Sequence, residues 1–121
     1  MAKSLVFGPF RLDLAARQLW RGEEPVALTP RAMDVLAYLA QSAGALVTRD
    51  QLFQALWPDV FVADHALSVQ ILEIRKALGD DAQRPMYIET RHRKGYRFCA
   101  TVVALEEPPT IPSPTGSRIT S

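Results

Sequence analysis

Residues 64–79, DHALSVQILEIRKALG, predict one long amphipathic helix, and the rest of the chain can be interpreted outward from it. Asp64 has the short acceptor side chain that caps a helix N-terminus, and Gly79 suits a left-handed residue after the last turn. One side carries an apolar stripe at helical spacing, formed by Leu67, Ile71, Ile74 and Leu78. We expect this stripe to pack on a core.

The opposite side of this predicted helix is chemically mixed. Its members are His65, Val69, Leu72, Glu73 and Lys76. This side is only weakly basic, so its charge does not identify what it contacts.

Size and composition predict one domain with a real core. The chain has 121 residues, 48% of them hydrophobic, and a net charge of +1 that hides any local clustering. Its one cysteine, Cys99, excludes an internal disulfide and a cysteine metal cluster, and fits a reducing cytoplasm. The first apolar run is broken at residues 8–9, so we expect no signal peptide. No stretch reaches the roughly 18 apolar residues of a membrane span.

Short strands and two more helices are expected before residue 64. Alternating or β-rich runs separated by tight turns predict strands at residues 5–7, 10–14, 18–21 and 26–28. A threonine followed by proline at 29–30 starts a helix that ends near residue 42. A capping-box pattern at 48–51 starts a second helix, which ends before the proline at position 58. A loop over residues 57–63 then leads to the long helix.

A basic hairpin is expected after the long helix. Residues 86–90 and 96–103 read as strands, with the turn Arg-His-Arg-Lys-Gly between them at 91–95. From residue 105 the chain is rich in proline, serine and threonine, so 105–121 are expected to be a linker or disordered tail.

Positive charge is concentrated in this hairpin. Residues 84–97 contain five Lys or Arg and one acid, a local charge of +4 in a chain of net charge +1. Such a cluster favours phosphate binding or entry into a minor groove, although a solvated turn is the simpler alternative. The second helix offers another anion site, because its N-terminal N–H groups are free beside Thr48 and Arg49. The phosphate or minor-groove candidates are Thr48, Arg49, Arg75, Thr90, Arg91, His92, Arg93, Lys94 and Arg97.

If the long helix enters a major groove, its mixed side supplies base contacts. Val69 can touch a thymine methyl group, and Glu73 can accept from cytosine N4. His65 or Lys76 can reach guanine or phosphate. Leu72 can contact a base or pack on the hairpin. Arg75, at the edge of the stripe, is either an intramolecular partner near Glu73 or a phosphate ligand.

Several motifs together resemble the OmpR/PhoB-type winged helix-turn-helix DNA-binding domain of bacterial transcriptional regulators. The match covers nearly everything from residue 5 to residue 101. Its most specific pieces are Leu-Thr-Pro at 28–30, Ile-Arg-Lys-Ala-Leu-Gly-Asp at 74–80, Tyr-Ile-Glu-Thr at 87–90 and Gly-Tyr-Arg-Phe at 95–98.

The resemblance implies an α+β winged helix-turn-helix fold with an N-terminal antiparallel four-stranded sheet, three helices and a C-terminal β-hairpin wing. It implies sequence-specific binding of double-stranded DNA, with the long helix in the major groove and the wing at the flanking minor groove. It also implies RNA polymerase and a second copy of the chain as further partners. The polymerase-facing loop would contain Trp57, Asp59, Val60 and Phe61, although the two aromatic residues are favoured as packing anchors.

The chain departs from the response-regulator version of this family, which serves phosphorelay signalling. That version often has arginine where this chain has His65, Leu72 and Glu73. The pattern looks more like the branch found at the N-terminus of larger one-component regulators. These departures affect the expected target sequence and leave the expected fold unchanged.

Two other classes of function compete with DNA binding. A winged-helix protein–protein module is favoured by the exposed Leu72 and opposed by the charge of the hairpin. An enzyme is disfavoured, because the two histidines, His65 and His92, and Cys99 form no recognisable catalytic or metal-binding motif. We therefore expect no cofactor and no metal.

Overall fold

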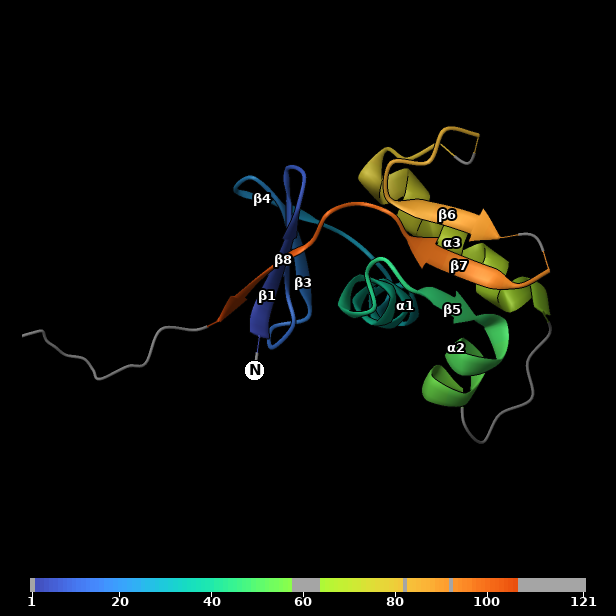
Figure 1. The fold of residues 1–121 in the computed structure, drawn as a ribbon. Helices are drawn as coiled ribbons and strands as arrows, with labels where there is room; N and C mark the ends of the chain where they lie inside the picture. Colours follow the sequence, from blue (N-terminus) through green and yellow to red (C-terminus); the bar gives the residue numbers. More distant parts are fainter. Residues whose placement is uncertain (1, 58–63, 82, 92, 107–121) are drawn as a thin grey trace, which may run out of the picture.

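The computed structural model describes residues 2–57, 64–81, 83–91 and 93–106. The chain has the predicted α+β class, with three helices and two antiparallel sheets, and α1 lies between the N-terminal sheet and the rest of the molecule (Figure 1). The elements, in chain order, are β1 (Ala2–Phe7), β2 (Phe10–Asp13), β3 (Gln18–Arg21), β4 (Glu24–Val26), α1 (Pro30–Gln41), β5 (Leu46–Thr48), α2 (Arg49–Leu56), α3 (Asp64–Leu78), β6 (Ile88–Arg91), β7 (Gly95–Phe98) and β8 (Val103–Glu106).

The N-terminal sheet has five strands in the order β4-β3-β2-β1-β8. Strands β2 and β3 lie where the sequence predicts them, whereas β1 begins three residues and β4 two residues earlier than expected, and β4 includes Pro25. Proline is tolerated there because β4 is an edge strand. The fifth strand, β8, pairs antiparallel with β1, and Val103 lies opposite Val6.

The predicted strand over residues 96–103 is wrong. Its two ends belong to different sheets, β7 and β8. The ladder between β6 and β7 ends where Ile88 pairs with Phe98, and one further bond joins the Cys99 N–H to the Tyr87 carbonyl at 2.7 Å. The chain then crosses to the N-terminal sheet. β8 also includes Leu105 and Glu106, which composition alone had assigned to the tail.

The helix termini follow the signals in the sequence for α1 and α2. The Thr29 hydroxyl caps α1 by accepting the Ala32 N–H at 3.3 Å. Thr48 and Gln51 form the predicted capping box of α2, with reciprocal bonds of 3.1 and 2.8 Å.

The two ends of α3 differ in how well the sequence predicts them. Gly79 has φ of 70°, and the Asp80 N–H bonds the Arg75 carbonyl at 2.8 Å, as in a glycine-capped helix end. Asp64, however, is the first helical residue, so the predicted capping position falls at residue 63, outside the described residues.

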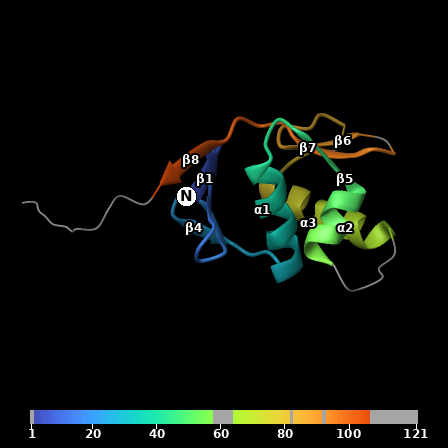
Figure 2. The same cartoon turned by 60° about the horizontal axis from the view of Figure 1, so that its bottom comes forward.

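The second sheet contains a strand that the sequence analysis missed. β5 pairs with β7, which pairs with β6, so the predicted hairpin becomes three-stranded. Val47 is buried on the inner side of β5 and Leu46 is exposed. In this register Thr48, the cap of α2, lies opposite Gly95 at the start of β7. The capped end of α2 and the tip of the hairpin are therefore held at one edge of the molecule (Figure 2).

Four aromatic rings join the two sheets. The Phe7 ring lies 5.0 Å from Phe98 and 6.0 Å from Tyr87, measured between centroids, and Phe10 packs 5.6 Å from Tyr87. Burial raises the pKa of the Tyr87 phenol above its usual value, and the nearby Asp80 carboxylate raises it further. This cluster anchors the base of the hairpin to β1 and β2 and contributes to one continuous core.

The close approach of β5 and β7 requires glycine at position 95. A Cβ placed there would lie 2.0 Å from the Val47 carbonyl oxygen and 2.8 Å from the Thr48 Cα. The φ of 154° at Gly95 is also one that L-residues rarely adopt. Because both obstacles are backbone atoms, only a shift of a strand can relieve the clash.

We therefore predict that Gly95→Ala lowers the free energy of unfolding by about 3 kcal/mol or more. Gly22→Ala is the matched control, since Gly22 has φ of 61° but nothing within 4 Å of its added Cβ. It should cost only about 1 kcal/mol, the strain of a left-handed residue. Urea unfolding of both variants measures the difference, and equal losses would contradict the proposed clash.

Candidate nucleic-acid interface

The outer face of α3 is defined here as its five exposed side chains opposite the apolar stripe. They are His65, Ser68, Val69, Leu72 and Lys76. The buried stripe is the predicted one, with Leu67, Ile71, Ile74 and Leu78 in the core. The sequence analysis missed Ser68, which lies on the helical wheel between the stripe and the predicted face. Its small polar side chain gave no other signal.

Glu73, a predicted base reader, is not among these five exposed side chains. Its carboxylate turns to the start of α1 and accepts the backbone N–H of Thr29 at 2.8 Å. The side chain is half-buried there. The positive N-terminal end of α1 favours a carboxylate at this place.

Arg75 fixes the other flank of α3. One guanidinium nitrogen donates to the Ile88 carbonyl at 2.9 Å and to the Thr90 hydroxyl at 2.7 Å. Arg75 thus has an intramolecular partner, but that partner is β6 and not the expected surroundings of Glu73. Thr90, a phosphate candidate, uses its hydroxyl as the acceptor of this bond.

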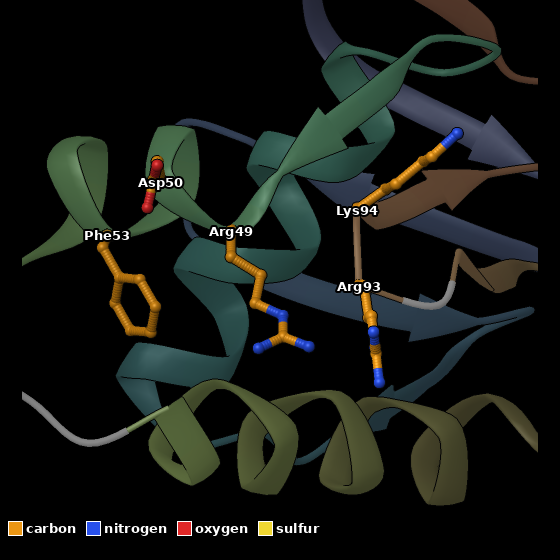
Figure 3. Close-up of a pocket in the computed structure, with 5 residues that line it drawn as sticks. All are labelled: Arg49, Asp50, Phe53, Arg93 and Lys94. Carbon is orange, nitrogen blue, oxygen red and sulfur yellow. The ribbon is translucent and has the colours of Figure 1, made fainter.

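Cationic side chains of α2 and of the hairpin tip line one pocket. This pocket has a volume of about 350 Å³ and is lined by Arg49, Asp50, Phe53, Arg93 and Lys94. Figure 3 shows Arg49 and Arg93 extending in the same direction, toward the ribbon of α3, whereas Lys94 extends the opposite way. The pairing of β5 with β7 brings these predicted phosphate candidates together.

The other two arginines of the hairpin face an acid. Glu89 lies between Arg91 and Arg97, with its Oε1 atom 3.4 and 3.5 Å from their Nε atoms. Within the described part of the chain, neither Arg93 nor Lys94 forms an ion pair. The net positive charge of the hairpin is therefore greatest at its tip. His92, also a candidate, lies outside the described residues.

The backbone of the tip is a tight turn. The Lys94 N–H donates to the Arg91 carbonyl at 2.9 Å, and Arg93 has a left-handed φ of 63°. A left-handed residue other than glycine is uncommon and carries a small conformational cost. The turn thus holds Arg93 in a defined backbone position.

The Asp80 carboxylate fixes the base of the hairpin to the end of α3. It accepts the backbone N–H groups of Met86 at 2.7 Å and Ile88 at 2.9 Å, and a longer bond from Tyr87 at 3.3 Å. These bonds close the loop between α3 and β6. Together with Arg75, they join the hairpin to α3 at two places.

Trp57 is a packing residue at the end of α2. Its ring lies 5.6 Å from Phe53, and the Arg31 guanidinium lies over it at 4.9 Å from the centroid. This geometry agrees with the favoured interpretation as a packing anchor. Asp59, Val60 and Phe61, the other residues proposed to face the polymerase, lie outside the described residues.

Other kinds of chemistry find little support in the described ranges. No group of three or more His, Cys, Asp or Glu side chains is gathered there to hold a metal ion. Burial raises the pKa of the Cys99 thiol, which disfavours the thiolate needed for nucleophilic attack. None of the helices, over the residues described, has the length and apolar character to cross a membrane.

Comparison with known families identifies the fold. The family model described as "Transcriptional regulatory protein, C terminal" matches residues 22–98. This chain belongs to that family, the OmpR/PhoB-type DNA-binding domains. The match includes all three helices and the β6–β7 hairpin, which is the wing of this family.

Two characterised relatives come from Escherichia coli. The KDP operon transcriptional regulatory protein KdpE is 39% identical over 93 residues, covering 76% of this chain and 41% of KdpE. The transcriptional activator CadC is 31% identical over 116 residues, covering 87% of this chain and 23% of CadC. The chain thus spans less than half the length of each of these relatives.

Solved structures agree with this assignment. The RstA DNA-binding domain of Klebsiella pneumoniae, solved in complex with the RstA box, superposes with a TM-score of 0.72 at 37% identity. The superposition covers 80% of this chain and 97% of that one. The DNA-binding domain of E. coli CadC gives a TM-score of 0.73 at 29% identity, with 84% and 96% covered.

The role of Glu73 is testable by unfolding. We predict that Glu73→Ala lowers the free energy of unfolding by about 1–2 kcal/mol, because the Thr29 N–H loses a charged acceptor. Glu73→Gln keeps an acceptor oxygen and should recover part of the loss. Chemical denaturation of the three proteins gives the order, and wild-type stability in Glu73→Ala would return Glu73 to the set of base readers.

The role of Asp80 has a matched control in its neighbour. Asp80→Ala should cost about 2–3 kcal/mol, because it leaves the Met86 and Ile88 N–H groups without their acceptor. Asp81→Ala removes one exposed bond to the Gln83 N–H and should cost less than about 1 kcal/mol. Denaturation curves provide the comparison, and faster amide exchange at Ile88 in Asp80→Ala alone would locate the effect.

Proposed function

We propose that this domain binds double-stranded DNA sequence-specifically, with the outer face of α3 in the major groove and the wing at the flanking minor groove. One observation carries the proposal. The β5–β7 pairing places the cationic wing tip beside the capped N-terminus of α2, and Arg49 and Arg93 extend toward α3. Phosphate ligands and base readers are then available on one side of the molecule.

The two groups of residues divide the work of recognition. Arg49, Arg93, Lys94 and the N–H groups beside Thr48 supply contacts to phosphate or to the minor groove, which give affinity without sequence information. His65, Ser68, Val69, Leu72 and Lys76 supply base contacts. Arg91 and Arg97 contribute less, because Glu89 balances part of their charge. Arg75 and Thr90 act indirectly by fixing the wing to α3.

The proposal also covers the biological role of the domain, its location and its protein partners. The domain serves a bacterial transcriptional regulator in the cytoplasm, where the chromosome is, and has no catalytic activity of its own. RNA polymerase, met through the loop at 57–63, and a second copy of the chain on adjacent half-sites are its proposed protein partners. The likeness to KdpE and CadC supports the regulatory role.

A winged-helix protein–protein module is the second candidate. The specific observation in its favour is that Leu72, on the outer face, is 55% exposed. The neighbouring cations oppose it, since Arg49, Arg93 and Lys94 suit a polyanion better than an apolar protein surface. Salt dependence distinguishes the two candidates.

We predict that affinity for duplex DNA falls steeply with salt and that Arg49→Ala/Arg93→Ala weakens binding and flattens the dependence. Loss of two phosphate contacts should reduce the slope of log K against log salt by about 1.8. The control, Arg11→Ala/Arg21→Ala, removes the same charge from β2 and β3 of the N-terminal sheet and should leave the slope nearly unchanged. Fluorescence anisotropy across a salt series measures both.

Equal slope changes in the two double variants would refute the assigned phosphate contacts. Absence of DNA binding by the wild-type chain at low salt would refute the proposed function itself.

A further inference from the structure

The centre of the outer face of α3 is apolar. Leu72 is 55% exposed and Val69 is 51% exposed, and both are large hydrophobic side chains on one surface of a single helix. They are separated by three positions, so their side chains are neighbours on the helix surface. Isolated exposed apolar residues are common, but an adjacent pair on a functional face calls for a partner.

The charged residues that flank this pair along α3 are directed elsewhere. Glu73 bonds the start of α1, and Arg75 bonds β6. Within the described residues of α3, the polar side chains left on the outer face are His65, Ser68 and Lys76. The middle of this face can therefore contact a base pair through van der Waals interactions rather than hydrogen bonds.

We infer that Val69 and Leu72 form a contact surface for thymine C5-methyl groups in the major groove of the target DNA. The methyl group of thymine is the apolar feature that the four base pairs present in this groove. Residues three apart on a helix are about 4.5 Å apart along its axis, close to the roughly 3.4 Å between successive base pairs. The pair can thus meet methyl groups on neighbouring base pairs.

DNA is the occupant that the surrounding charge favours. Lys76 lies on the same face, and Arg49 and Arg93 extend toward α3 from the adjoining pocket. This inference rests on the proposed function, and it adds the chemistry by which α3 discriminates. Leu105 is 45% exposed on β8 in the N-terminal sheet, away from the pocket of Arg49 and Arg93, and serves as a control.

The test removes the methyl group from the DNA and leaves the protein intact. Bound sequences are first selected from a random duplex pool, and each thymine of the selected site is then replaced by uracil, which lacks only the C5 methyl. Affinity for each duplex is measured at constant salt. We expect one or two positions at which uracil weakens binding about fourfold, the loss of one buried methyl group.

Two variants assign that effect to the helix. In Leu72→Ala, uracil and thymine should bind equally at one or more of the sensitive positions, whereas Leu105→Ala should keep the full difference. Because both leucines are exposed, both variants should fold, and circular dichroism checks this. Uracil sensitivity retained at every position in both Leu72→Ala and Val69→Ala would overturn the inference.

The remaining outcomes are distinguishable. If a motif is selected but uracil has no effect at any position, the methyl contact is wrong and the proposed DNA binding stands. If no motif is enriched and the chain does not bind duplex DNA, both fail, and the apolar pair is then assigned to a protein partner.

Discussion

The approach of β7 to the backbone of β5 is the constraint on which the interface depends. Gly95 lets two backbones meet where any side chain would strike the Val47 carbonyl. That contact places the wing turn beside the capped end of α2, although the two lie more than forty residues apart in the chain. Without it, the cations of the wing and of α2 would be separate surface charges. With it, they form one electropositive edge next to α3.

Polar contacts on both flanks of α3 fix its rotation about its own axis. Its apolar stripe allows some rotation, because leucine and isoleucine make non-directional contacts. The directional bonds are those of Glu73 to the start of α1 and of Arg75 to β6, one on each flank. These two charged side chains restrict which residues face outward, and they do so without occupying that face.

Local signals in the sequence predicted the helices and the strands of the hairpins, because caps, turns and periodicity act within a few residues. The structure of residues 96–103, in contrast, depends on partner strands that are distant in the sequence. No local signal in the sequence indicates that the pairing of β7 with β6 ends at Phe98 or that Val103 pairs with Val6. β5 was missed for the same reason, since three residues become a strand only when β7 lies beside them.

The sequence likewise predicted only part of the candidate site. The apolar stripe fixes which side of α3 is buried, and this correctly placed His65, Val69, Leu72 and Lys76 on the exposed side. The stripe does not indicate which elements contact the two flanks of α3. The bond between Glu73 and the start of α1 could therefore not be predicted from the sequence.

The pairing of β8 with β1 has a consequence for where the described chain ends. The last described strand lies in the N-terminal sheet, on the side of the molecule remote from the wing (Figure 1). Glu106, the last residue that the structure describes, is therefore on the side of the molecule opposite the proposed DNA-binding surface. A force applied at the end of β8 would load its hydrogen bonds to β1 first, and these lie far from the proposed base-reading face of α3.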